Sequence, residues 1–296
     1  MARTGARLGQ HFLKHAWAAA KLAHAVMPLP GETILEIGPG KGVLTAELLT
    51  LGDVVAVEKD SELVAVLNER FAGEIAAGRL RIIEADVRDT VIEQVKMARD
   101  ARRGEAAREP YSSTVSAMLR LRNDADGVIL GGGYILAANI PYYITGEIIR
   151  QFLSAERQPR AMALLIQKEV AQRITGGKES ILSLSVKAYG TPKILAKVSR
   201  THFSPPPSVD SSILAITDIS KQFFVDINEE DFFSLVHAGF SSKRKFLSSN
   251  LSVRYDKSAV AQAFEAIGIP QKARAEDVSI ENWRALTQAL RHKLLR

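Results

Sequence analysis

Hydrophobic positions between residues 33 and 218 fall into short apolar runs that predict buried strands, separated by segments whose spacing predicts helices. The first run contains Ile34, Leu35 and Ile37 and ends at a group of glycines, after which Leu44 and Leu48 mark one face of a helix. Further strands are predicted at 54–57, 80–83, 133–138, 161–166, 182–186, 194–198 and 211–216. Strands that alternate with helices in this way predict an α/β fold with a doubly wound sheet.

The alternating pattern is interrupted once and later stops. Residues 90–130 are rich in charge and poor in large apolar side chains, so we expect an insertion there, helical at 91–103, within a sheet domain of residues 31–218. From residue 221 onward the spacing predicts helices alone, at 231–238, 243–251, 258–267 and 280–294, the last with Ser279 as N-cap. We therefore expect a small all-helical C-terminal domain at 221–296 and a basic N-terminal arm at 1–30.

The glycines after the first strand indicate a nucleoside ligand, because glycine lets a backbone approach a ligand closely and a helix N-terminus offers free N–H groups. Gly38 and Gly40 do not continue into the dinucleotide fingerprint, since Val43 stands where that pattern has its third glycine. Acidic residues follow the next two strands. Glu58 is placed to accept hydrogen bonds from both ribose hydroxyls, and Asp86 to accept the exocyclic amine of an adenine. In this order the features favour S-adenosylmethionine as cofactor.

The tetrapeptide Asn139-Ile140-Pro141-Tyr142 supplies the groups that methylation of an adenine amine requires. This amine is a poor nucleophile because its lone pair is delocalised into the ring, so an enzyme must hold its N–H bonds and turn the lone pair toward the methyl donor. The Asn139 side-chain oxygen and the backbone carbonyl of Ile140 or Pro141 can accept these N–H bonds. Pro141 fixes the turn, and Tyr142 offers a face for stacking. No metal is needed for this chemistry, because the cofactor carries the reactive methyl group.

Composition limits the class of protein. The chain has 296 residues, 46% of them hydrophobic, enough for a substantial core. The absence of cysteine excludes disulfides and thiolate metal sites and fits a reducing cytoplasm. No apolar run reaches the roughly 18 residues of a membrane span, and the N-terminus lacks the apolar segment of a signal peptide. We therefore expect a cytoplasmic protein that does not contact a membrane.

The net charge of +6 suggests a polyanionic partner. Basic residues gather in the arm, which carries Arg3 and Arg7 and no acidic residue, and in a basic triplet of Lys243, Arg244 and Lys245. Either group could contact RNA phosphates, and either could be an ordinary solvated surface.

Seven motifs are spread over the chain: GQHFL at 9–13, EIGPGKGVLT at 36–45, VEKD at 57–60, EADV at 84–87, NIPYYIT at 139–145, QKEVAQR at 167–173 and FSPPPSVDSSI at 203–213. Together they resemble the KsgA family of ribosomal RNA small-subunit adenine N6,N6-dimethyltransferases. The resemblance covers nearly the whole chain except 90–130, a connection that the family usually keeps short. It implies a Rossmann-like methyltransferase sheet and methyl transfer from S-adenosylmethionine to two adjacent adenosines near the 3′ end of small-subunit rRNA. The implied partner is this rRNA or the immature small ribosomal subunit, and we expect a monomer.

The resemblance also implies roles for single residues. The expected cofactor-binding residues are His11, Leu13, Gly38, Gly40, Glu58, Asp86 and Asn139. The expected catalytic residues are Asn139, Pro141, Tyr142 and Phe203, with Tyr142 and Phe203 as a stacking pair around the target base. His11 is a departure from the family pattern, which commonly has asparagine at this position.

Three alternatives remain open from the sequence. A related group that methylates large-subunit rRNA and confers macrolide resistance shares the Asn-x-Pro-Tyr element, although the basic triplet followed by Leu247 and Asn250 is more similar to the small-subunit family. A catalytically silent rRNA-binding assembly factor would be expected to lose cofactor residues, which are intact here. A nicotinamide oxidoreductase is disfavoured by Val43.

Overall fold

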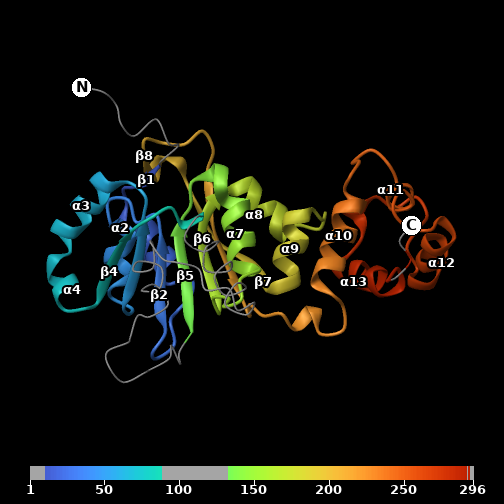
Figure 1. Ribbon diagram of the computed structural model, residues 1–296. Helices are drawn as coiled ribbons and strands as arrows, with labels where there is room; N and C mark the ends of the chain where they lie inside the picture. Colours follow the sequence, from blue (N-terminus) through green and yellow to red (C-terminus); the bar gives the residue numbers. More distant parts are fainter. Residues whose placement is uncertain (1–10, 89–132, 292, 294–296) are drawn as a thin grey trace, which may run out of the picture. The chain divides into compact units, whose positions relative to one another are not determined.

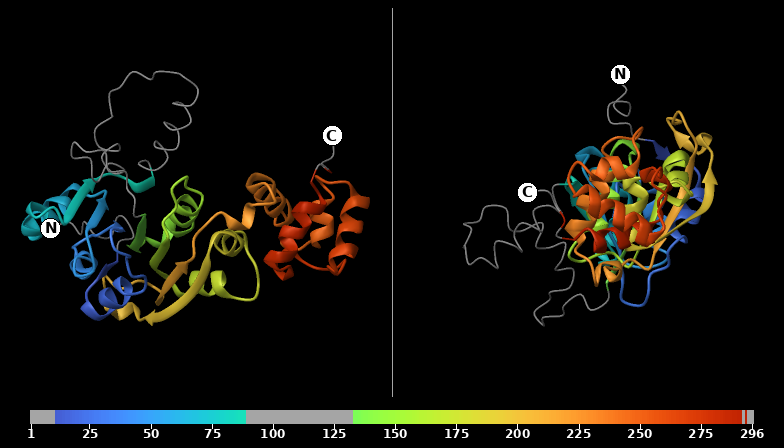
Figure 2. Two further views of the ribbon diagram at one scale, coloured as in Figure 1. Left: turned by 90° about the horizontal axis from the view of Figure 1, so that it is seen from below. Right: turned by 90° about the vertical axis from the view of Figure 1, so that its right-hand side faces the viewer.

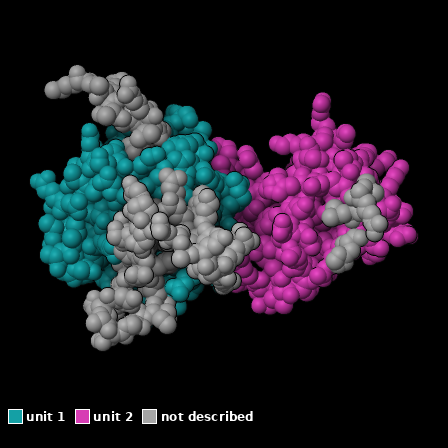
Figure 3. Space-filling model, viewed as in Figure 1, with its two compact units in different colours: residues 1–168, 193–219 teal, residues 169–192, 220–296 magenta. Residues whose placement is uncertain are grey.

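In the computed structural model, residues 11–88, 133–291 and 293 are described, and the chain forms two compact units (Figures 1 and 3). The first unit comprises the described part of residues 1–168 together with 193–219, and the second comprises 169–192 and the described part of 220–296. The helix predicted at 91–103, with the rest of the expected insertion, and Arg3 and Arg7 lie outside the described residues. Within the described residues, no helix has the length and apolar character that crossing a membrane requires.

The core of the first unit is a seven-stranded sheet with the strand order β4-β3-β2-β5-β6-β9-β7. Neighbouring strands from β4 to β6 run parallel, and β9 is antiparallel to β6. The strands are β2 (Thr33–Ile37), β3 (Val54–Glu58), β4 (Leu80–Glu84), β5 (Tyr134–Asn139), β6 (Ala161–Gln167), β7 (Thr191–Val198) and β9 (Ser211–Thr217). The strand order reverses at β2, between β3 and β5, and ligands of such sheets bind at the carboxyl ends of the strands at this point.

Helices lie on both sides of this sheet, as Figure 2 shows, and the doubly wound prediction is confirmed. Parallel strands covered on both faces are apolar along their whole length, which explains the short continuous runs in the sequence. On one face Ile34, Ala56 and Ala137 pack with Leu22 and Leu48 of two helices in one apolar cluster. The helices of the first unit are α1 (Ala16–Ala23), α2 (Val43–Leu48), α3 (Ser61–Arg70), α4 (Ala72–Ala76) and α7 (Thr145–Leu153), with the short 3-10 helices η2 (Tyr142–Ile144) and η3 (Arg200–His202).

A second, two-stranded sheet ties the start of the described chain to a distant segment. Strand β1 (Phe12–Leu13) pairs antiparallel with β8 (Phe203–Ser204). Beyond the ladder, the Lys14 N–H donates to the His202 carbonyl over 2.9 Å, and the His11 ring nitrogen Nδ1 lies 2.9 Å from the Pro205 carbonyl oxygen. The segment around Phe12 is therefore docked on the fold, although residues 1–10 are outside the description.

The second unit is helical. Its largest fully buried side chains include Trp283, Phe232 and Phe264, and Ser279 caps α13 by accepting a hydrogen bond from the Asn282 N–H, as predicted. Gly239 packs directly against Trp283, because a Cβ there would lie 2.3 Å from the indole ring. The helices are α8 (Lys168–Thr175), α9 (Ile181–Tyr189), η4 (Gln222–Phe224), α10 (Glu229–Gly239), α11 (Leu247–Leu251), α12 (Lys257–Ile267), η5 (Ala275–Asp277) and α13 (Ile280–Ala289).

The strand predicted at 182–186 is wrong, because this segment belongs to helix α9. The alternation of leucine and serine resembles a strand pattern, but Ser183 and Ser185 are both buried. Ser180 and Ser183 form a capping box that starts the helix, and the Ser185 hydroxyl donates to the Ile181 carbonyl within it. Because α9 contributes Leu184 to the apolar core of the helical unit, that unit begins earlier in the chain than the expected 221.

Two predicted helices are shorter than expected. The segment 243–246 is a turn, and α11 begins only at Leu247. The basic triplet therefore lies on an exposed turn rather than on a helix face. The last helix ends at Ala289 rather than at residue 294.

Candidate active site

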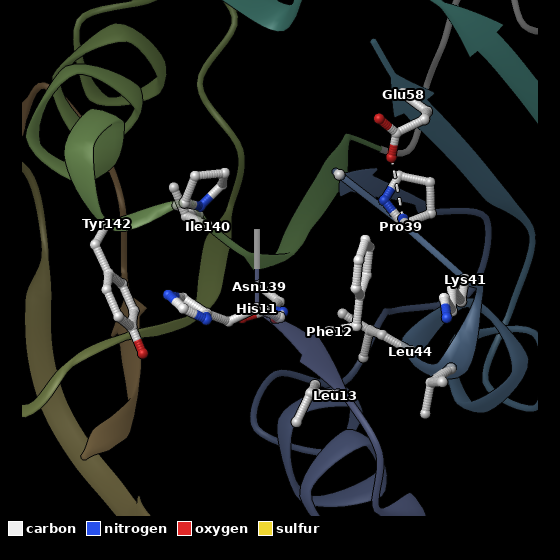
Figure 4. Close-up of a pocket in the computed structure, with 14 residues that line it drawn as sticks. His11, Phe12, Leu13, Pro39, Lys41, Leu44, Glu58, Asn139, Ile140 and Tyr142 are labelled. Atoms are coloured by element: carbon white, nitrogen blue, oxygen red, sulfur yellow. Dashed lines mark hydrogen bonds between the residues drawn. The ribbon is translucent and has the colours of Figure 1, made fainter. Parts of the chain in front are cut away.

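A pocket that is partly open to solvent lies at the reversal of strand order (Figure 4). Its walls come from β1, the glycine loop after β2, the end of β3 and the end of β5. The lining residues are His11, Phe12, Leu13, Gly38, Pro39, Gly40, Lys41, Val43, Leu44, Glu58, Asn139, Ile140, Pro141 and Tyr142. The structure thus brings most of the predicted site residues together, and it leaves out Asp86 and Phe203.

The glycine loop adopts a backbone that side chains disfavour. Gly38 and Gly40 have φ values of +66° and +58°, in the left-handed region. A Cβ at Gly38 would meet no atom within 4 Å, so this glycine borders open space in the pocket. A Cβ at Gly40 would lie 2.9 Å from the ring of Phe12. Gly40 therefore allows β1 to dock on the loop, and Gly38 keeps a cradle open for a ligand.

The carboxylate of Glu58 is held in place by three backbone N–H groups. Oε2 accepts from Gly40 over 3.0 Å, and Oε1 accepts from Lys59 and Asp60 over 2.9 and 3.0 Å. The residue is 5% exposed and ends β3 beside the pocket. Each carboxylate oxygen has two lone pairs, and three of the four are already used, so Oε2 can still accept one hydrogen bond from a ligand hydroxyl.

Glu36, which the sequence analysis did not single out, is a second buried acid just before the glycine loop. It is fully buried on β2 between Ala56 and Ala137, and neither of its carboxyl oxygens has a hydrogen-bond partner among the described residues. Burial raises its pKa to about 8, and the negative charge of Glu58 acts in the same direction. The Thr45 hydroxyl acts in the opposite direction and offsets part of the rise in the pKa of Glu36.

Asp86 does not line the pocket. Its carboxylate accepts from the backbone N–H, Nε and terminal nitrogen of Arg88 over 3.0, 3.0 and 2.6 Å, and from Lys59 Nζ over 2.9 Å. Arg88 first, and Lys59 after it, hold the pKa of this carboxyl well below its usual range. The side chain expected to meet an adenine amine is therefore engaged with two cations, a contact that no spacing rule in the sequence predicted.

Asn139 ends β5 and is fixed by the first strand. Its Nδ2 donates to the His11 backbone carbonyl over 3.0 Å. With the amide nitrogen engaged, Oδ1 has no hydrogen-bond partner among the described residues and is left as an acceptor at the pocket. In Figure 4, Glu58 and Tyr142 lie on opposite sides of the pocket, with Asn139 between them.

The expected stacking pair of Tyr142 and Phe203 needs correction. Phe203 is 1% exposed because β8, paired with β1, directs it into the apolar core. The ring beside Tyr142 is instead that of His11, with centroids 5.6 Å apart and planes inclined by 34°. The Tyr142 hydroxyl is 2.7 Å from Ser211 Oγ, which holds the phenol ring at the pocket edge.

Five pocket residues were not among the expected site residues: Phe12, Pro39, Lys41, Val43 and Leu44. The ammonium of Lys41 lies 5.4 Å from the centre of the Phe12 ring, which in turn packs on Gly40. Phe12 and Lys41 lie inside the motifs GQHFL and EIGPGKGVLT. Including every residue of these two motifs in the expected site would have found both.

The basic triplet belongs to the second unit and is exposed. Phe240, the aromatic residue before it, stacks on Trp283 with centroids 5.8 Å apart. Phe246 follows the triplet directly and is 42% exposed. The aromatic side chain available beside the three cations is therefore Phe246 rather than Phe240.

Solved structures with a similar fold include a dimethyladenosine transferase from Plasmodium falciparum, with a TM-score of 0.69 and 21% identity over 93% of this chain and 96% of that one. The 23S rRNA methyltransferase ErmE aligns with a TM-score of 0.67 and 24% identity over 94% of this chain and 99% of its own. At this level of identity both comparisons show the fold alone.

Curated relatives are more similar in sequence. "Ribosomal RNA small subunit methyltransferase A" of Dehalococcoides mccartyi strain BAV1 is 35% identical over 284 residues, covering 94% of this chain and 86% of the relative. The protein of the same name from Moorella thermoacetica is 33% identical over 291 residues, covering 96% and 91%. The model of the family described as ribosomal RNA adenine dimethylase matches residues 1–292. The chain therefore belongs to the ribosomal RNA adenine dimethylase family.

Proposed function

We propose that this protein transfers methyl groups from S-adenosylmethionine to the N6 atoms of two adjacent adenosines near the 3′ end of small-subunit rRNA, giving dimethyladenosine. Family membership and the names of the curated relatives support the substrate class. The single observation that carries the chemistry is Asn139, whose amide nitrogen is fixed by the His11 carbonyl so that its oxygen remains as an acceptor in the pocket.

The pocket fits S-adenosylmethionine. Gly38 borders open space that a Cβ would enter, and Glu58 is a preoriented acceptor with one lone pair left for a ribose hydroxyl. Leu13, Val43 and Leu44 supply apolar lining. When bound, this cofactor supplies an electrophilic methyl group. Asp86 could accept an adenine amine only by sharing its carboxylate with Arg88 and Lys59 or by releasing one of them.

The residues at the end of β5 act on the nucleophile. Asn139 Oδ1 can accept one N–H bond of the target amine, and a backbone carbonyl can accept the other. The Pro141 carbonyl already accepts from the Ile144 N–H over 3.2 Å and lies 3.5 Å from the Thr145 hydroxyl. This occupation favours the Ile140 carbonyl as the second acceptor. Two acceptors hold the N–H bonds away from the ring plane, which concentrates the lone pair on nitrogen.

Tyr142 supports the target base from one side. Its hydroxyl contact with Ser211 fixes the ring, and His11 lies next to it at the pocket edge. A general base is not needed, because the nitrogen becomes strongly acidic once it carries the additional methyl group and loses its proton to water. The chain contributes mainly orientation, by which a bound base can be brought in line with the methyl donor.

The proposed partner is the immature small ribosomal subunit, bound by a monomer in the cytoplasm. Support comes from the exposed basic triplet with Phe246 beside it, since cations next to an exposed ring suit phosphates and bases. The proposed RNA contacts of Arg3 and Arg7 rest on the sequence alone.

The test is methyl transfer from labelled S-adenosylmethionine to immature small subunits, with immature large subunits as the matched control and mapping of the modified bases. We expect label at two adjacent adenosines of small-subunit rRNA. Label only in large-subunit rRNA would support the macrolide-resistance type of activity instead. Tight rRNA binding without label in either particle would indicate a silent assembly factor.

A further inference from the structure

An exposed aromatic cluster lies on the first unit, outside the pocket. It consists of Trp17, His15 and His202, named here the Trp17 cluster. Trp17 is 54% exposed, and its ring centroid lies 5.8 Å from that of His202. His202 in turn contacts His15 edge-on at 4.8 Å, and its Nδ1 lies 3.1 Å from the Ser199 carbonyl oxygen. The rings therefore support one another in fixed positions while leaving a face of Trp17 to solvent.

Packing does not explain this tryptophan. Helix α1 buries its small residues Ala18, Ala19 and Ala23 together with Leu22, and Trp17 lies on the opposite, exposed side. The other tryptophan of the chain, Trp283, is fully buried in the core of the second unit. A ring that is 54% exposed gains only part of the stability that full burial gives, and its free face is available to stack on a ligand ring.

The Trp17 cluster adjoins the pocket along the backbone. Leu13 lines the pocket, and the next residue, Lys14, donates its N–H to the His202 carbonyl over 2.9 Å. The β1–β8 ladder thus connects the pocket wall directly to both histidine-bearing segments. The Trp17 cluster is thus a surface beside the pocket that nucleotides flanking a bound base could contact.

The charge around the cluster is positive. Lys21 follows Trp17 by one helical turn and shares its exposed face, and Lys14 and Arg200 are also exposed. None of these three forms a salt bridge with a described residue. The acidic neighbour is Asp210, whose carboxylate accepts the Arg200 backbone N–H over 3.0 Å. Cations around an aromatic platform are the arrangement that single-stranded nucleic acid recognises.

We propose that the Trp17 cluster stacks an unpaired base of the RNA strand that carries the target adenine. The proposal rests on the proposed function, because it takes rRNA as the ligand. Trp17 provides the face, His202 and His15 hold it, and the nearby cations attract the flanking phosphates. Loss of one stacking ring is expected to weaken RNA binding by about 5-fold to 100-fold.

The test uses an RNA hairpin with two adjacent adenosines in its loop, and a fully paired duplex of the same composition as control. Acrylamide quenching reports Trp17 selectively, since Trp283 is 0% exposed. We expect the hairpin, and not the duplex, to protect Trp17 from acrylamide. Trp17→Ala should weaken hairpin binding and raise KM for RNA while kcat and cofactor affinity stay unchanged, and Trp17→Phe should restore most of the affinity. Met27→Ala, which removes another side chain that is 51% exposed, should behave like wild type.

Failure of this inference is distinguishable from failure of the proposed function. Protection of Trp17 by the hairpin in a protein that transfers no methyl group would support the stacking surface and refute the enzyme activity. Methyl transfer with unchanged acrylamide quenching and wild-type RNA affinity in Trp17→Ala would overturn the stacking surface and leave the activity intact.

Discussion

Replacing Glu36 with glutamine should change how the stability of the first unit depends on pH. The carboxyl is fully buried, has no hydrogen-bond partner within the described part of the chain, and has a pKa raised from 4.5 to about 8. Between these two values the unfolded chain releases the proton and the folded chain keeps it. Stability from this group is therefore fully present below pH 4.5 and is lost as the pH rises to about 8.

The magnitude follows from the proton linkage. Each pH unit in this window costs about 1.4 kcal/mol of stability, so the whole window amounts to a few kcal/mol. Glutamine has nearly the same shape and does not ionise. Relative to wild type, Glu36→Gln should therefore become progressively more stable from pH 5 to pH 8, whatever its stability at pH 5.

The assay is urea unfolding followed by circular dichroism at several pH values, using the transition that the substitution shifts. Glu32→Gln is the matched control, because Glu32 is also buried but its pKa is lowered, with Arg160 bonding it over 2.7 Å. The stability that ionised Glu32 contributes is present above pH 4.5 and is lost only as the pH falls through the folded pKa of this residue. The difference in unfolding free energy between Glu32→Gln and wild type should therefore be constant from pH 6 to 8. Parallel pH profiles for wild type and Glu36→Gln would refute the assignment of a protonated buried carboxyl.

Three further predictions concern binding and chemistry. Glu58→Ala should weaken S-adenosylmethionine binding by roughly 1–3 kcal/mol in calorimetric titration. Asp86→Ala should have a smaller effect, because that carboxylate is already held by two cations. Equal cofactor affinity in wild type and both variants would remove both residues from the site. Asn139→Ala should keep cofactor and RNA affinity and slow single-turnover methyl transfer by orders of magnitude, and near wild-type chemistry would mean that another group positions the amine. Alanine at all three positions of the basic triplet should weaken binding to small subunits and reduce the slope of log affinity against log salt by roughly 0.7 to 0.9 per lost contact. An unaltered slope would make the triplet an ordinary solvated surface.

Local pattern was sufficient to predict the sheet and the glycine loop. Continuous apolar runs, the spacing from Gly38 to Val43, and acids at strand ends are all signals within a few residues, and the structure has β2, β3 and β4 where they were expected. Helix α9 was missed because its serines look polar in the sequence, although Ser183 and Ser185 satisfy their hydroxyls by hydrogen bonds within or next to the helix and are buried.

The errors at the site have a different cause, which is contact between distant segments. The pairing of β1 with β8 buries Phe203 and brings the His11 ring to Tyr142, and no local pattern near either segment predicts this register. The isolation of Glu36 depends likewise on Ala56 and Ala137 on the two flanking strands. The Arg88 contact of Asp86 spans only two residues, but side-chain direction, which the sequence does not give, decides it.

We propose that the Asn139 amide at the end of β5 directs methyl transfer to the exocyclic nitrogen of adenine. Mass spectrometry of small-subunit rRNA, both as nucleosides and as ribonuclease fragments, after incubation of immature particles with the protein and S-adenosylmethionine, gives the identity and the position of each modified base. We expect N6,N6-dimethyladenosine at two adjacent positions. Methyl groups on a ring nitrogen, on a ribose hydroxyl or on another base would contradict it.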